Sequence, residues 1–231
     1  MKKSQNLSRK AKLAELINEN PKLLRLLPRF NIALGFGDHS VEDVCRMSHV
    51  NVNLFLMVCG VYTDPSTTPH GIDYDNADID SLLAYLNASH RFYLEEKFPH
   101  IEEHLGRIIK AGGPKYGNML KHFYDEYQKE MSSHFRYEEE VVLPYIDALR
   151  KGQKPTAYDI NQFRHNHSNI EDALEDMNNI LIKYLPGDIL PKERIEIATD
   201  IMELSADLIS HSLIEEHILI PYVESLENAL T

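Results

Sequence analysis

Apolar side chains recur at intervals of three or four residues in four long segments of the chain. Positions at this spacing share one face of an α-helix, so each segment predicts an amphipathic helix with a buried face. The four apolar stripes are Leu83, Leu86 and Tyr93; Leu120, Phe123, Tyr127, Met131, Val141 and Tyr145; Ile160, Phe163, Ile170, Leu174 and Leu181; and Ile201, Leu204, Leu208, Ile218 and Tyr222.

Turn-forming residues separate the four segments. Glycine and proline gather at residues 111–114 (AGGP), 151–156 (KGQKPT) and 185–191 (LPGDILP), and a Pro/Thr/Asp-rich loop covers residues 63–75. Long helices joined by short loops are typical of an antiparallel bundle. The predicted fold class is therefore all-α, with a four-helix bundle over residues 76–231.

Residues 1–66 predict a separate, smaller helical domain. Ser40 is placed to cap a helix that starts at Val41, and Asp43 stands three residues after the cap, a variant of the capping box. Residues 40–62 also have the rhythm of helix, short turn and helix. We place the boundary to the bundle near residue 70.

An internal repeat lies in the bundle half. His134-x-x-x-Glu138 returns 77 residues later as His211-x-x-x-Glu215, and each pair is followed by a second glutamate and then a proline. The same offset relates two lone histidines, because His90 and His167 each precede their pair by 44 residues. This arrangement predicts two helical hairpins related by a pseudo-twofold axis.

The spacing within each pair is that of two ligands on one ion. Residues i and i+4 of an α-helix lie about 40° apart around the axis and one turn apart along it, so His134 and Glu138 can aim at one point. The midpoint between His90 and His134 falls in the AGGP turn, and that between His167 and His211 falls in LPGDILP. Each lone histidine is therefore expected at the height of its partner, roughly 33 Å from the turn.

The six residues share the apolar stripes of the predicted helices, and each stripe continues past the ligands to residues such as Val141 and Ile218. An unpaired imidazole or carboxylate in a core costs several kcal/mol, so a converging set of this kind needs cations. Imidazole with carboxylate suits iron, with zinc and manganese as competitors. The predicted metal ligands are His90, His134, Glu138, His167, His211 and Glu215.

Other histidines match the pattern less well. His122, His165 and His217 are expected on the surface because they point away from the ligand face of their helices. His104 shares the face of His90 but stands fourteen residues along the same helix, about 21 Å away, and becomes a fifth histidine ligand only if the helix bends. Glu139 and Glu216 are expected to contact solvent or groups around the ligands.

Composition narrows the functional classes. The net charge of −12 disfavours a nucleic-acid partner, and no stretch approaches eighteen uninterrupted apolar residues, which argues against a membrane partner. The N-terminal segment carries positive charge but no apolar run, so no secretion signal is indicated. Cys45 and Cys59 are too few for a disulfide framework. We therefore expect a cytoplasmic protein.

The order of ligands resembles the hemerythrin HHE cation-binding family, whose pattern is a lone His, His-x-x-x-Glu, a second lone His and a second His-x-x-x-Glu. The match covers residues 76–228 and includes the glutamate and proline after each pair. The resemblance implies a non-haem di-iron centre, oxo- or carboxylate-bridged, that binds dioxygen or nitric oxide.

Residues 12–62 resemble the small N-terminal domain of the RIC family, proteins implicated in the repair of iron–sulfur centres. That domain carries a vicinal cysteine pair in the family, whereas the matching stretch here, residues 32–38 (IALGFGD), has none. Cys45 and Cys59 stand elsewhere, so the thiol chemistry of the family does not carry over.

Three functional hypotheses follow. The first is a di-iron protein that binds dioxygen or nitric oxide or handles iron, in oxidative or nitrosative stress or in iron–sulfur centre repair. The second is a metal-dependent sensor whose N-terminal helices contact a protein partner. The third is an oxidase or ferroxidase, ranked below the others because no paired acid and base outside the ligand set identifies a substrate pocket.

Overall fold

The computed structural model describes residues 7–66, 79–153, 155, 157–166 and 170–230, with the side chains of residues 165, 166 and 170–172 also outside the description. Within these ranges all regular structure is helical, apart from one isolated bridge between Lys12 and Ser40. The predicted all-α, hemerythrin-type fold is therefore confirmed. None of the described helices contains a stretch long and apolar enough to cross a lipid bilayer.

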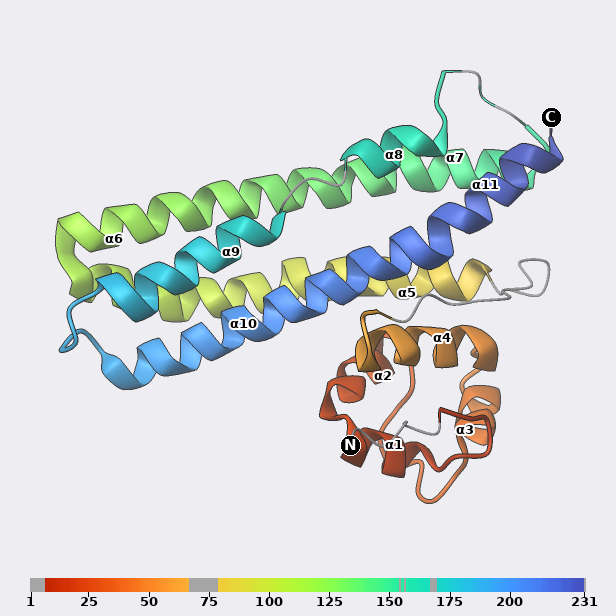
Figure 1. Ribbon diagram of the computed structural model, residues 1–231, viewed down its shortest axis with the longest axis horizontal. Helices are drawn as coiled ribbons and strands as arrows, with labels where there is room; N and C mark the ends of the chain where they lie inside the picture. The colour runs from red at the N-terminus through yellow and green to blue at the C-terminus, as the bar shows by residue number, and fades with distance from the viewer. Residues whose placement is uncertain (1–6, 67–78, 154, 156, 167–169, 231) are drawn as a thin grey trace. The chain divides into compact units, whose positions relative to one another are not determined.

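The helices are numbered along the chain as in Figure 1. A 3₁₀ turn at Pro21–Arg25 and four π-helical turns at Phe92–Lys97, Glu138–Val142, Ile180–Tyr184 and Glu215–Leu219 complete the described helical segments. The α-helices are α1 Leu13–Glu19, α2 Leu26–Arg29, α3 Val41–Met47, α4 Val52–Thr63, α5 Ile79–Arg91, α6 Phe98–Tyr137, α7 Leu143–Arg150, α8 Ile160–Asn166, α9 Ile170–Asn179, α10 Pro191–Ile214 and α11 Ile220–Ala229.

Residues 90–209 form one compact unit, built from two helical hairpins. In the first hairpin α6 folds back on itself at Gly113, and in the second α9 and α10 are joined by residues 185–190 (Figure 1). Gly113 has φ 65° and ψ −171°, a conformation that glycine adopts without the steric cost of a side chain. The predicted AGGP turn is thus a sharp bend between two helical arms, at residues 98–112 and 114–137.

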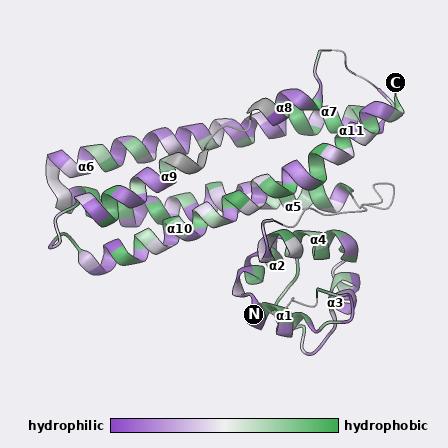
Figure 2. Ribbon diagram, in the orientation of Figure 1, coloured by the Kyte–Doolittle hydropathy of each residue, from purple (hydrophilic) through white to green (hydrophobic). Residues whose placement is uncertain are grey.

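The core of this unit lies between the arms. α6, α9 and α10 each carry apolar and polar residues along their lengths, as Figure 2 shows, and many of the apolar ones are buried in the core, although Ile195 and Met202 of α10 are exposed. Gly117 lets the two arms of α6 come close, because a Cβ there would stand 2.3 Å from the carbonyl oxygen of Ile109. The core includes Tyr93, Phe98, Leu105, Leu120, Tyr127, Phe135, Leu174, Leu181, Ile197, Ile201 and Leu204.

The other unit comprises residues 1–89 and 210–231. Ser40 caps α3 as predicted, since its hydroxyl accepts a hydrogen bond from the Asp43 amide at 3.2 Å and donates one to the Asp43 carboxylate at 2.6 Å. The α1–α4 segment has its own apolar core, which includes Leu13, Leu26, Leu27, Val44, Phe55 and Val58. Whether residues 1–66 and 76–231 are separate domains stays a prediction.

Buried aromatic and polar contacts connect the first helices to α5 within this unit. Arg29 donates a hydrogen bond to the Tyr62 hydroxyl at 2.8 Å, and that hydroxyl lies 3.2 Å from the hydroxyl of Tyr85 on α5. Phe30 stacks on the Tyr85 ring at 4.8 Å between centroids. The N-terminal helices therefore contact the helix that carries His90.

Each of the four π-helical turns is followed by one residue and then by a proline. At the end of each turn one amide bonds the carbonyl five residues earlier, for example Leu143 to Glu138 and Ile220 to Glu215. Proline has no N–H, and its ring clashes with the carbonyl four residues before it, so an ordinary α-helical turn is disfavoured there. The four prolines are Pro99, Pro144, Pro186 and Pro221.

The extra residue in these turns changes which side chains face inward. The sequence predicted that Val141 would continue the stripe of His134 and Glu138, but Val141 is exposed and Val142 is buried. The same shift occurs after Glu215: Tyr222 was predicted to be buried but is half-buried, and Val223 is fully buried instead. Both predictions were wrong because they assumed 3.6 residues per turn through a segment that the following proline widens.

Candidate metal centre

His90 is the next-to-last residue of α5, which ends at Arg91 and is followed directly by the π-helical turn Phe92–Lys97. Its side chain is 2% exposed, and its ring stacks on Phe135 at 4.4 Å between centroids. Phe135 also stacks on Tyr93 at 5.7 Å. This aromatic packing holds the imidazole in a fixed orientation inside the unit of residues 90–209.

Glu138 joins two histidines. Its Oε1 atom lies 2.8 Å from Nε2 of His134, four residues earlier on α6, and its Oε2 atom lies 2.8 Å from Nε2 of His90. The carboxylate is only 4% exposed, and the His134 side chain is 11% exposed. Two imidazoles and one carboxylate thus form a buried cluster that uses both carboxylate oxygens.

The two histidines keep this carboxylate ionised. Burial by itself raises the pKa of Glu138, but hydrogen bonds from His134 and then His90, together with the charges of both, outweigh it and bring the pKa below its ordinary value. An ionised carboxylate and imidazole nitrogens are the forms that bind metal ions.

Glu139 contacts the far side of the His90 ring. Its Oε1 atom lies 3.3 Å from Nδ1 of His90, and its side chain is 47% exposed. A carboxylate at Nδ1 fixes the orientation and tautomer of a histidine so that Nε2 points the other way. His90 therefore directs Nε2 at Glu138 while Glu139 holds Nδ1.

The second His-x-x-x-Glu pair is also buried. Nε2 of His211 lies 3.1 Å from Oε1 of Glu215, and the two side chains are 2% and 1% exposed. Asp207, one turn before His211 on α10, is another buried acidic side chain, at 3% exposure. Sequence reasoning missed Asp207, although its spacing of four residues before His211 was a usable signal.

The structure brings His90, His134 and Glu138 together, and it places His211 beside Glu215. His167 lies outside the described residues, as does the side chain of His165. His122 is exposed, as predicted, whereas His217 is half-buried. The buried His and Glu side chains that could serve as metal ligands include His90, Glu138, His211 and Glu215.

Comparison with known proteins agrees with this ligand pattern. The family model described as the hemerythrin HHE cation binding domain matches residues 81–223. The chain belongs to the hemerythrin HHE family. The matched range contains both His-x-x-x-Glu pairs and both lone histidines.

Two curated relatives extend the comparison. The chain is 24% identical over 111 residues to the iron-sulfur cluster repair protein ScdA of two strains of Staphylococcus epidermidis. The alignment covers 46% of this chain and 50% of each relative, so the chain spans about half the length of those relatives. These proteins are similar to a part of the chain.

The residues of this HHE chain suit a metal ion by their chemistry. The Nε2 atoms of His90 and His134 and the two oxygens of Glu138 lie within 2.8 Å of one another in pairs, so a cation could take these nitrogens and oxygens as ligands. Imidazole and carboxylate are the ligand types of non-haem iron and of zinc. The cluster around Glu138 is therefore a chemically suitable half of a metal site.

Proposed function

We propose that the protein binds two iron ions through His90, His134, Glu138, His167, His211 and Glu215. The observation that carries this proposal is the cluster in which one buried carboxylate meets two imidazoles at 2.8 Å. The repeat of the His-x-x-x-Glu pair at Glu215, also buried, supports a second half of the same construction. Zinc and manganese are the competing metals for these ligand types.

The side chains have separate roles in this proposal. The two oxygens of Glu138 face different histidines, so Glu138 would hold metal together with His90 through one oxygen and with His134 through the other. Phe135 and Tyr93 exclude water from one side of His90 through their stacked rings. Iron supplies open coordination positions for a small ligand such as dioxygen or nitric oxide.

We further propose a role in oxidative or nitrosative stress, or in the repair of iron–sulfur centres, in the cytoplasm. The similarity to the ScdA proteins of Staphylococcus epidermidis, which are named for iron–sulfur cluster repair, supports it. Cys45 and Cys59 are free thiols and are both buried, which agrees with a reducing compartment. Their burial raises the pKa of Cys45 to about 12 and that of Cys59 further, so neither is suited to act as a nucleophile.

A metal-dependent sensor is the second candidate function. The contacts that run from Arg29 to Tyr62 and from Tyr62 to Tyr85 favour it, because Tyr85 stands five residues before His90 on the same helix. A change in the position of His90 can therefore reach the N-terminal helices through α5. Hydrogen exchange of α1–α4 in the full chain, with and without iron, tests it: equal exchange in both states would reject the sensor.

Metal analysis combined with an ultraviolet–visible spectrum tests the iron proposal. Protein produced with iron is expected to hold about two irons per chain, with a ferric absorption that changes when nitric oxide is added. The double variant His134→Ala, His211→Ala is expected to lose both, whereas His122→Ala, at an exposed histidine of α6, keeps both. Retention of iron and spectrum by the double variant would reject the proposal.

A further inference from the structure

α10 carries a row of apolar side chains that face solvent rather than the core. Ile195 is 68% exposed and Met202 is 51% exposed. Thr199 lies between them and is also exposed, and the half-buried Ala206 and Ile209 continue the row. The five positions follow one another at intervals of four, three, four and three residues. This alternation is the heptad spacing of a helix that packs against a second helix.

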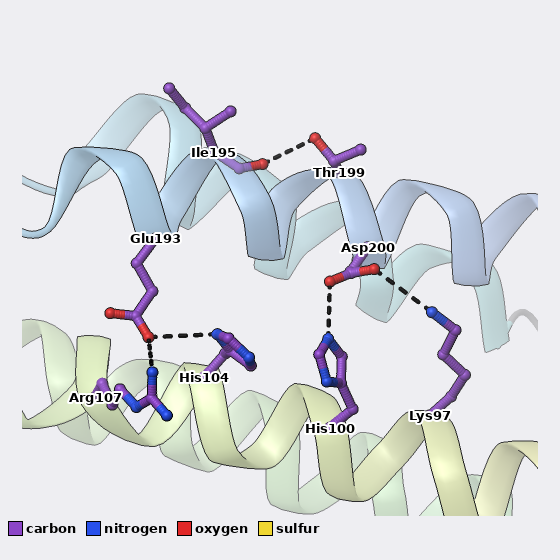
Figure 3. A network of polar contacts seen from close by, with 8 residues as sticks. All are labelled: Lys97, His100, His104, Arg107, Glu193, Ile195, Thr199 and Asp200. Atoms are coloured by element: carbon purple, nitrogen blue, oxygen red, sulfur yellow. Dashed lines mark hydrogen bonds and ion pairs between the residues drawn. The ribbon is translucent and has the colours of Figure 1, made fainter.

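The row lies on the side of α10 that points away from the first arm of α6. Oε1 of Glu193 lies 3.3 Å from Nδ1 of His104 across the contact between these helices. Farther along, Oδ2 of Asp200 lies 3.1 Å from Nε2 of His100. Each residue of an α-helix advances about 100° around the axis, so Ile195 points roughly 200° away from Glu193. Figure 3 shows Ile195 on the side of α10 opposite the two histidines.

Thr199 adds less polarity to the row than its residue type indicates. Its hydroxyl donates a hydrogen bond to the carbonyl oxygen of Ile195 at 2.8 Å, as Figure 3 shows. The hydroxyl proton is therefore engaged by the backbone of the same helix. Large apolar side chains that gather on a surface in this way mark an interaction site more often than chance exposure does.

Acidic side chains border the row on one side. Glu196 and Glu203 each follow a member of the row by one residue, stand seven residues apart, and are exposed. Positions beside a heptad seam carry the charges that select the partner helix and its orientation. The sequence of α10 contains no lysine or arginine after Arg194. The charge beside the row is therefore negative and is complemented by a basic partner.

We propose that this row and its acidic border form a docking site for an amphipathic helix of a partner protein. The partner helix carries leucine-like side chains on one face and lysine or arginine beside that face, so that it covers Ile195 and Met202 and pairs with Glu196 and Glu203. A second copy of the chain suits the site less well, because it would bring together two acidic surfaces of chains that each have a net charge of −12. The site contains none of the proposed metal ligands, so this inference is independent of the proposed function.

A designed peptide tests the site on the full-length protein. The peptide has about 21 residues, with leucine at the two seam positions of each heptad and lysine beside them, and binding is followed by fluorescence anisotropy. The wild-type chain is expected to bind this peptide at least tenfold more tightly than a peptide of the same composition in scrambled order, which lacks an apolar face. Equal binding of the two peptides would overturn the proposal.

Replacement of the two exposed apolar side chains tests their part in binding. The double variant Ile195→Ser, Met202→Ser is expected to bind the lysine peptide at least tenfold more weakly, because the contact loses its two large apolar groups. Leu34→Ser is the matched control and is expected to bind as the wild type does, since it removes an apolar side chain that is 74% exposed in another part of the chain. Unchanged affinity in the double variant would overturn the proposal.

Charge reversal tests the acidic border separately. The double variant Glu196→Lys, Glu203→Lys is expected to prefer a peptide in which glutamate replaces lysine, whereas the wild type prefers the lysine peptide. A retained preference for lysine would overturn the assignment of a basic partner. Sedimentation velocity of the full chain gives a further check, because a dimer that Ile195→Ser, Met202→Ser dissociates would make a second copy the occupant instead. Far-ultraviolet circular dichroism verifies that each variant is folded.

Discussion

The two His-x-x-x-Glu pairs have the same local design but differ in their surroundings. In both, the glutamate is the first residue of a π-helical turn, and a proline follows six residues after that glutamate. The His-to-Glu distances are 2.8 Å in the first pair and 3.1 Å in the second. The first histidine, His134, is 11% exposed, whereas His211 is 2% exposed. Local sequence thus fixes the pair, and the packing around it sets how accessible it is.

The described contacts of the two glutamates differ as well. Glu138 contacts both His134 and His90 at 2.8 Å, so its carboxylate links the end of α5 to the end of α6. The lone histidine that corresponds to His90 in the second half, His167, lies outside the described residues. Changes at equivalent positions of the two pairs therefore test whether the halves are functionally equivalent.

Removal of each glutamate should have the largest effect. Glu138→Ala is expected to abolish binding of both irons, because it removes a carboxylate that faces two imidazoles. Glu215→Ala is expected to abolish binding as well if the halves act together, and to leave about one iron per chain if they act independently. Iron per chain, measured by elemental analysis on folded protein, decides between these outcomes. Full iron retention in Glu138→Ala would contradict the assignment.

Acid should weaken the metal-free protein through the first pair. The pKa of Glu138 is lower in the folded chain than its ordinary value of 4.5, so ionisation of this group stabilises the fold above that value. The stabilisation is lost as the pH falls below 4.5 toward the lowered pKa. Denaturant unfolding of the chelated wild type and of Glu138→Gln is expected to differ most near neutral pH and progressively less in acid. A difference that grows in acid would contradict the lowered pKa.

The π-helical turns offer a smaller perturbation of the same comparison. Pro144→Ala restores an N–H that can bond the carbonyl of Glu140, which favours an ordinary α-helical turn and turns Val142 away from the core. Iron affinity and the free energy of unfolding are both expected to fall. Pro155→Ala, at an exposed loop position, is the matched control. Unchanged iron affinity in Pro144→Ala and in Pro221→Ala would show that the turns do not position the ligands.

The same prolines show what sequence reasoning could and could not predict. The helices, the Ser40 cap, the bend at Gly113 and the inward direction of Glu138 follow from local spacing and turn chemistry, and the structure agrees with them. Val141 and Tyr222 were placed wrongly because a continuous helical period was assumed across each proline. The proline after each ligand pair was visible in the sequence and was the signal for a widened turn.

Contacts between helices that are far apart in the sequence could not be predicted either. His104 was expected to face inward about 21 Å along the helix from His90, and the structure places it against Glu193, 89 residues later in the chain. No periodicity within one helix contains that information, because it depends on how α6 and α10 are aligned. Glu139 is a similar case: its position after Glu138 did not show which side of His90 it contacts.

Glu139→Gln should have the smallest effect on iron affinity. It tests whether a carboxylate beside the ligands matters in the first half of the site and not in the second. The carboxylate at 3.3 Å from Nδ1 orients His90, and replacement by an amide weakens that contact without removing a ligand. Iron affinity is expected to fall by about tenfold, the lower end of the range for groups that support a ligand. Glu216→Gln is the equivalent change in the second pair, where the side chain is exposed, and is expected to leave affinity unchanged. A competition titration with a chelator measures both variants. Equal losses in the two would mean that charge near the centre, rather than orientation of His90, is what Glu139 provides.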